Sequence, residues 1–138
     1  MRIENRILVG KGEVEAAILP EMANRHGMIA GATGTGKTIT LKVMAESFSD
    51  LGVPVFLADV KGDLSGCCKP GEMSEKIEKR LNGIGIDPAG FEMKRYPVRF
   101  WDVYGEGGHP VRFTVRQHQL AITEPVVLLL LLNLARLR

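Results

Sequence analysis

The hydrophobic pattern at the start of the chain predicts a β-hairpin. Two short apolar runs, residues 7–9 and residues 16–19, flank the turn-forming triplet of residues 10–12, and Pro20 follows the second run. Runs of this length bounded by glycine and proline are typical of strands joined by a tight turn. We therefore expect residues 1–23 to form short N-terminal strands.

Residues 24–58 predict a strand, a glycine-rich turn, a helix and a second strand. Residues 28–30 are apolar and are followed by Gly31, and residues 37–51 carry apolar side chains at mostly helical spacing up to Gly52. Residues 53–58, VPVFLA, form a continuous apolar run of the kind that a strand buried on both faces requires. Because strand, helix and strand follow one another, we expect a mostly parallel sheet.

The second half of the chain predicts one more helix, one more strand and an apolar C-terminal helix. Ser74 is positioned to cap a helix that ends near residues 87–88, and residues 96–103, YPVRFWDV, predict a strand followed by a GEGGHP turn. The uninterrupted apolar run of residues 126–132 is far shorter than the ~20 residues that cross a bilayer. We interpret it as a helix that is buried in the protein.

Length, charge and cysteine content restrict the class of protein. A chain of 138 residues accommodates one ordinary core, and its net charge of +2 provides no large field to hold a polyanion, so charge alone does not argue for nucleic-acid binding. Cys67 and Cys68 are sequence neighbours, which strains a disulfide between them. Charges interrupt the apolar N-terminus, unlike a signal peptide. We expect a reduced, cytoplasmic protein that does not enter a membrane.

The sequence GATGTGKT, residues 31–38, fits the P-loop pattern G-x-x-x-x-G-K-[ST] at every fixed position. Glycines let backbone N–H groups turn inward at a helix N-terminus, where the helix dipole favours an anion. Lys37 would reach the outer phosphates of ATP, and the Thr38 hydroxyl would ligate Mg²⁺. A chance match is the alternative, but an apolar strand before the loop and an amphipathic helix after it argue against chance. The predicted cofactor-binding residues are Gly34, Thr35, Gly36, Lys37, Thr38 and Ile39.

Asp59 is the second candidate site residue, because it ends the apolar strand of residues 53–58. Open α/β sheets collect ligand-contacting groups at this edge, so Asp59 could assist catalysis beside Lys37 or contact Mg²⁺ through water. It lies on the first strand after the P-loop helix, however, and no glutamate follows it to polarise water. An equally weighted alternative is that Asp59 simply starts a turn, with Lys61 and Asp63 in solvent.

Asp102 ends another apolar run and precedes the GEGGHP stretch. An active-site loop and a simple hairpin turn both fit this arrangement, and we favour the turn. The three histidines and two cysteines share no metal-ligand spacing, so no metal other than Mg²⁺ is indicated.

Two segments, residues 24–46 and residues 52–66, resemble the helicase HerA-like ATPases of bacteria, which are members of the HerA/FtsK group of P-loop motors. The second segment contains the stretch FLADVKGDLSG. The resemblance continues through residues 88–115, which contain the specific stretch WDVYGEGGHPVR. It implies a partial RecA-like core, ATP and Mg²⁺ as ligands, and hexamers that move along DNA. By the same resemblance, Asp59 and Lys61 correspond to an acid-x-lysine element after the second core strand.

The resemblance covers residues 24–115, whereas residues 116–138 fit the family poorly apart from their leucine-rich character. We expect a single incomplete domain, because the family's Walker B strand, polar sensor and arginine finger lie beyond the matching part. Truncation, a shifted reading frame or a degenerate copy would each explain such a C-terminal segment.

Two functions remain open at this point. One is a DNA-translocating ATPase in which Lys37, Thr38 and Mg²⁺ neutralise developing phosphate charge. The other is a nucleotide-binding remnant that folds its loop and performs no hydrolysis. A small-molecule kinase is disfavoured, because the sequence has no identifiable arginine-bearing lid.

Overall fold

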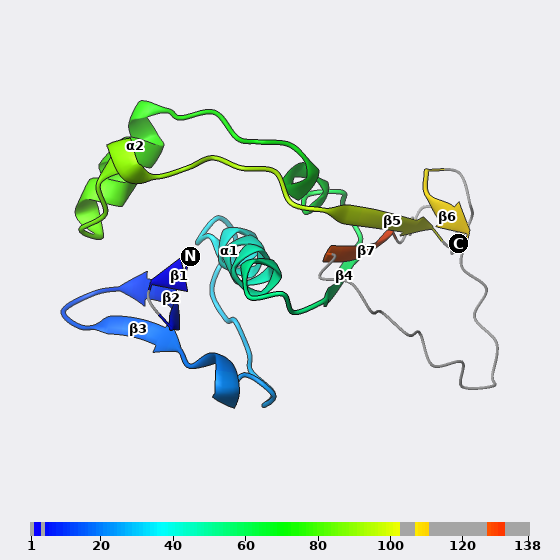
Figure 1. The fold of residues 1–138 in the computed structure, drawn as a ribbon, viewed down its shortest axis with the longest axis horizontal. Coiled ribbons are helices and arrows are strands. Elements are labelled where there is room, and N and C mark those ends of the chain that lie inside the picture. Colours follow the sequence, from blue (N-terminus) through cyan, green and yellow to red (C-terminus); the bar gives the residue numbers. More distant parts are fainter. Residues whose placement is uncertain (1, 4, 103–106, 111–126, 132–138) are drawn as a thin grey trace.

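The computed structural model describes residues 2–3, 5–102, 107–110 and 127–131 (Figure 1). Its strands are β1 (Arg2–Ile3), β2 (Arg6–Lys11), β3 (Glu15–Ile18), β4 (Val55–Asp59), β5 (Val98–Asp102), β6 (His109–Pro110) and β7 (Val127–Leu131). The helices are α1 (Lys37–Asp50) and α2 (Glu75–Gly83), with short 3-10 turns η1 (Pro20–Met22), η2 (Ser65–Cys68) and η3 (Pro88–Gly90).

The N-terminal strands form a small antiparallel sheet in the order β1-β2-β3. The hairpin of β2 and β3 confirms the expectation for this region, and its register shifts between Leu8 and Gly10, as in a β-bulge. At the end of β2, the Lys11 ammonium donates to the carbonyl of Ile84 at 3.1 Å. This bond attaches the hairpin to the C-terminal end of α2.

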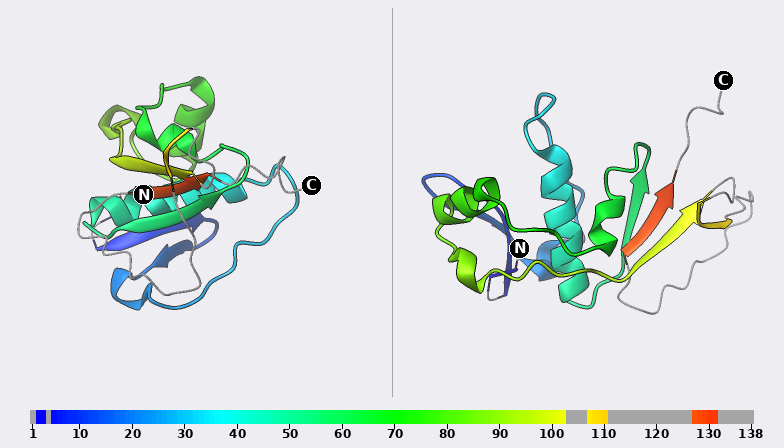
Figure 2. Two further views of the ribbon diagram at one scale, coloured as in Figure 1. Left: turned by 90° about the vertical axis from the view of Figure 1, so that its right-hand side faces the viewer. Right: turned by 90° about the horizontal axis from the view of Figure 1, so that it is seen from above.

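The second sheet has the order β4-β7-β5-β6, and all of its pairings are parallel. The right-hand view of Figure 2 shows β4, β7 and β5 running in the same direction beside α1. The expected α/β class is therefore confirmed at the level of a short antiparallel hairpin and a small parallel sheet.

The expectation that residues 126–132 form a helix is wrong, because Val127–Leu131 is strand β7. The strand lies between β4 and β5 and pairs with both over its full length. An inner strand of a parallel sheet is flanked by partners and reads as a continuous apolar run. A run of five to seven such residues does not distinguish a strand from a buried helix by periodicity. The remaining residues of the expected C-terminal helix lie outside the described part of the chain.

Helix α1 packs on one face of the parallel sheet. Ala45 of α1, Leu57 of β4 and Leu64 form the buried cluster, and four partly buried side chains pack against it, namely Leu41, Val55, Val98 and Phe100. Because Val55 and Leu57 alternate with Phe56 along β4, this pattern assigns every second residue of the strand to the α1 face. The core of the described fold is therefore the contact between α1 and this face.

The expectation that residues 53–58 are buried on both faces is wrong. Phe56 is 52% exposed, and Ala58 and Val60 are also exposed. The buried cluster lies on the opposite face, and burial of both faces would need a second layer of elements. Residues 53–58 therefore contain more apolar side chains than the described fold buries.

Two of the three predicted helices are present, with small differences at their ends. Helix α1 has 14 residues and stops before Gly52, whose φ of 77° suits a helix terminus. Ser74 occupies the N-cap position of α2, but its hydroxyl makes no capping bond. The helix stops at Gly83, earlier than expected, and Gly85 follows with a φ of 75°. Neither helix of the described chain combines the length and apolarity that crossing a bilayer requires.

The two faces of β4 predict opposite responses to truncation. Leu57→Ala removes a buried side chain from the α1 contact and should lower the free energy of unfolding by about 2–4 kcal/mol. Phe56→Ala, the adjacent exposed position, should change it by less than about 1 kcal/mol. Urea denaturation followed by circular dichroism measures both values. Equal losses for the two variants would contradict this assignment of faces.

Candidate functional site

The glycine-rich loop, residues 31–36, leads directly into α1. Gly34 and Gly36 have φ values of 82° and 92°, and Gly36 is the N-cap of the helix. Both dihedrals are in the left-handed region, which strains residues with a side chain. The two glycines therefore serve the loop by their backbone freedom, as the sequence predicts.

The strand expected immediately before this loop, residues 28–30, is absent from the structure. These residues belong to no strand, and the Met28 side chain is 88% exposed. A strand requires a neighbour, and the described ladder of β4 is with β7. The helix expected after the loop is confirmed and the strand before it is wrong, so the structure does not establish a RecA-like core.

The side chain of Lys37 folds back over the loop. Its ammonium donates to the carbonyl of Gly31 at 2.9 Å and to the carbonyl of Ala32 at 2.7 Å. The hydroxyl of Thr35 donates to the same Ala32 carbonyl at 2.8 Å. The cation is therefore fixed against the backbone of the loop, close to the N-terminus of α1.

The first turn of α1 presents backbone N–H groups at the same place. The first bond within the helix runs from the Thr40 N–H to the Gly36 carbonyl at 2.9 Å, so the N–H groups of Lys37, Thr38 and Ile39 precede it. Gly36 supplies no side-chain cap, and the first turn contains no acidic residue. The predicted residues Gly34 to Ile39 thus form one continuous turn with a positive electrostatic character. The Ile39 side chain is apolar and 61% exposed, so the hydrogen-bond donor that this residue offers here is its backbone N–H.

Asp59 is buried at the end of β4, and its carboxylate holds the loop that follows. One carboxylate oxygen accepts from the N–H of Lys61 at 3.2 Å and of Gly62 at 2.8 Å, and the other accepts from the N–H of Leu64 at 2.9 Å. Lys61 and Asp63 are exposed, in line with the turn alternative. The geometry therefore shows a structural use of Asp59 whether or not it also contacts a metal.

The glycine-rich loop and the Asp59 loop lie at the same end of the fold. The right-hand view of Figure 2 shows the N-terminal end of α1 on the side toward which β4 and β7 point. In open α/β sheets, ligands bind at this carboxyl-terminal edge of the strands. The two predicted site segments are therefore brought to one edge, although 21 positions separate Asp59 from Thr38 in the sequence.

Asp102 belongs to the same edge, a relation that the sequence did not reveal. Asp59 and Asp102 are both buried and both pair in register with Leu131 of β7. In-register residues of parallel strands share a face, so the two acids stand in one row, two strand spacings or about 10 Å apart. Each acid ends an apolar run, which is the only local signal; their shared row depends on β7.

The expectation of a simple hairpin after Asp102 is wrong, because β6 pairs with β5 in parallel. The carboxylate of Asp102 accepts from the N–H of Gly107 at 2.9 Å. A Cβ on Gly108 would lie 2.7 Å from the carbonyl oxygen of Phe100. Residue 108 can lie this close to the backbone of β5 only because it is glycine.

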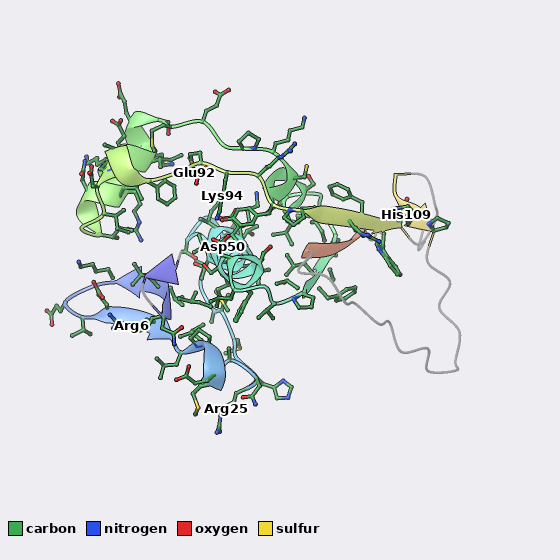
Figure 3. All side chains as sticks on the ribbon, viewed as in Figure 1. Arg6, Arg25, Asp50, Glu92, Lys94 and His109 are labelled. Atoms are coloured by element: carbon green, nitrogen blue, oxygen red, sulfur yellow. The ribbon has the colours of Figure 1, made fainter. Side chains whose placement is uncertain are left out.

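The far end of α1 is fastened to the segment that leads into β5. The carboxylate of Asp50 pairs with the ammonium of Lys94 at 2.6 Å and accepts from the Tyr96 hydroxyl at 3.3 Å. Figure 3 shows Lys94 directed toward Asp50. Burial, reinforced by the Asp50 charge, raises the pKa of Tyr96 above its ordinary value. These contacts help to fix the orientation of α1.

Cys67 of η2 lies near Glu46 of α1, and its surroundings do not activate the thiol as a nucleophile. Burial raises the pKa of its thiol, and the nearby Glu46 raises it further. Burial also raises the pKa of Glu46 itself. Cys67 and Cys68 are both free, and a thiol kept protonated is a poor nucleophile. Among residues that the structure describes, no cluster of three or more histidine, cysteine or acidic side chains is placed to hold a metal ion.

Comparison with protein families adds the relationship that geometry alone does not give. The family model described as helicase HerA-like C-terminal matches residues 4–137. The chain belongs to the HerA-like helicase family. Searches of curated proteins and of solved structures gave no significant match. The resemblance to HerA-like proteins is therefore confirmed, and the matched range includes the C-terminal part that we expected to diverge.

The bonds of Asp59 predict a loss of stability when the carboxylate becomes an amide. Asp59→Asn in this HerA-like chain replaces one acceptor oxygen by an NH₂ group and leaves a loop N–H facing a donor, which should lower the free energy of unfolding by about 1–3 kcal/mol. The matched control is Asp63→Asn, an exposed acid in the same loop, and it should change stability by less than about 0.5 kcal/mol. Chemical denaturation compares the two, and equal stability of both variants would refute the structural use of Asp59.

Proposed function

We propose that residues 31–38 are the P-loop of a HerA-like ATPase with a RecA-like core and bind ATP together with Mg²⁺. The observation that carries this proposal is the position of the Lys37 ammonium, which rests on the carbonyls of Gly31 and Ala32 beside the N-terminus of α1. A cation and a row of backbone N–H groups at one helix end are the donor set that phosphate requires.

Each part of the loop has a distinct role in this proposal. The N–H groups of residues 34–39 contact the phosphate oxygens, and Lys37 adds a positive charge for the outer phosphates. The hydroxyl of Thr38, an exposed residue in the first turn of α1, ligates Mg²⁺. The bonds from Lys37 to the loop carbonyls hold its ammonium in place before the nucleotide arrives, which reduces the entropy lost on binding.

Asp59 is retained in the proposal as a contact to Mg²⁺ through water and as a weaker candidate for catalysis. Its oxygens accept three backbone bonds, yet a carboxylate has about four lone-pair sites, so one further water-mediated contact is chemically compatible. Phosphoryl transfer depends on positioning and charge stabilisation. A carboxylate held rigidly at the strand edge suits that requirement.

We extend the proposal to DNA as the substrate along which hydrolysis moves the protein, with a hexamer as the working assembly. Family membership supports this extension. The net charge of +2 lends it no support of its own. The cytoplasm is the compartment that this function implies.

A second function, nucleotide binding without hydrolysis, is favoured by the surroundings of Asp59. All three of its described bonds serve its own loop, and Val60 follows it where a Walker B pair would have glutamate. A site without a residue to orient water binds ATP but turns it over slowly. Binding and turnover therefore have to be measured separately.

Titration calorimetry with Mg²⁺–ATP tests the binding claim. Lys37→Ala should weaken binding at least about tenfold, because it removes a charge-assisted contact to phosphate. Lys42→Ala, the same change further along α1, is the matched control and should bind within about twofold of the wild type. Equal affinities for wild type and Lys37→Ala would refute the P-loop function.

Phosphate release with and without duplex DNA separates the two functions. Turnover that DNA stimulates, and that Lys37→Ala abolishes, would establish the translocase and exclude the non-hydrolysing module. ATP binding with turnover no greater than that of Lys37→Ala would establish the module instead. Asp59→Asn should reduce turnover more than binding if Asp59 contacts the metal.

A further inference from the structure

Three donors converge on one carbonyl in the glycine-rich loop. The Ala32 oxygen accepts from the Lys37 ammonium at 2.7 Å, from the Thr35 hydroxyl at 2.8 Å and, more weakly, from the Thr35 N–H at 3.4 Å. The P-loop pattern specifies Lys37 but permits any residue at position 35. The hydroxyl bond from Thr35 therefore belongs to this chain and not to the general pattern, whereas its N–H bond does not depend on the side chain.

The glycines of the loop are of two physical kinds. Gly34 and Gly36 have positive φ values, and a Cβ on either would meet nothing within 4 Å. Gly31 has no such dihedral, but a Cβ there would lie 2.6 Å from the Thr35 hydroxyl oxygen and 3.6 Å from the Thr35 Cβ. Gly31 is thus excluded from bearing a side chain by the hydroxyl group of Thr35, whereas Gly34 and Gly36 are needed for backbone conformation.

We propose that Thr35 is a positioning residue whose hydroxyl fixes the Ala32 carbonyl, and through it the Lys37 ammonium, and that Gly31 is glycine to make room for this hydroxyl. In this proposal the Thr35 hydroxyl acts through Ala32 and Lys37 and has no direct role in contacting the nucleotide. The inference rests on the proposed ATP binding for its consequence, but its geometry concerns the free loop.

The hydroxyl can be removed without changing the shape of the side chain. Thr35→Val keeps the branched form and removes the donor, so the Ala32 carbonyl retains Lys37 but loses its closest neutral partner. Thr35→Ser keeps the donor. Thr35→Ser is therefore the matched control, since it differs from Thr35→Val in keeping the hydroxyl that donates to Ala32. The buried cluster around Ala45 is two to three turns away along α1, so none of these changes should affect folding.

The first test measures Mg²⁺–ATP affinity by calorimetry. Thr35→Val should weaken binding about threefold to tenfold, while Thr35→Ser should stay within about twofold of the wild type. Wild-type affinity in Thr35→Val, in a protein that loses binding on Lys37→Ala, would overturn the inference and leave the proposed function intact. Equal binding by wild type and Lys37→Ala would overturn the proposed function instead.

A double variant tests the steric half. Gly31→Ala should weaken ATP binding more than Thr35→Ala, because the added methyl displaces the Thr35 hydroxyl and the backbone with it. The double variant Gly31→Ala/Thr35→Ala should bind as well as Thr35→Ala alone, because the remaining contact to the Thr35 Cβ is an ordinary one. Losses that simply add would refute the pairing of Gly31 with Thr35.

A third measurement needs no nucleotide. The ¹³C carbonyl resonance of Ala32 in the free protein reports hydrogen bonding at its oxygen, and it should move upfield in Thr35→Val but not in Thr35→Ser. An unchanged resonance in Thr35→Val would overturn the inference even if the protein does not bind ATP. The inference and the proposed function can therefore fail independently.

Discussion

The contact between α1 and the parallel sheet determines where every candidate site residue lies. A small residue, Ala45, allows the helix to approach Leu57 of β4, and Leu64 closes the cluster. Helix α1 and strand β4 are consecutive in the chain and pack against each other. The N-terminal end of α1 therefore lies on the same side of the fold as the C-terminal end of β4. The glycine-rich loop is thereby held at the carboxyl-terminal edge of the sheet, the edge at which α/β folds bind ligands.

Two loops at this edge are ordered by polar groups of opposite kind. In the glycine-rich loop the donors of Lys37 and Thr35 hold backbone carbonyls. In the loop after β4 the carboxylate of Asp59 holds backbone N–H groups. Both arrangements give hydrogen-bond partners to main-chain groups that lie outside helices and strands. In both loops these bonds hold the backbone that carries the exposed residues.

The candidate site was predictable where its chemistry is local. The pattern of Gly36, Lys37 and Thr38 identified the loop and the first residue of α1, because dihedral preference and helix initiation depend on neighbouring residues. The pairing of Gly31 with Thr35 is also short-range, yet a pattern that permits any residue at position 35 does not reveal it. The relation of Asp59 to Asp102 was beyond reach, because it depends on a strand between them.

The hairpin, helices α1 and α2, the glycine-rich loop and the family could all be recognised from the sequence. The assembled fold was needed to establish that residues 127–131 form the inner strand β7, that Phe56 faces outward and that residues 28–30 pair with no described strand. The physical reason is the range of the interactions. Turns and helices close their hydrogen bonds within about five residues, whereas a strand is defined by partners from distant parts of the chain. An apolar run in the sequence therefore predicts burial, but whether it is a strand or a helix depends on the assembled sheet.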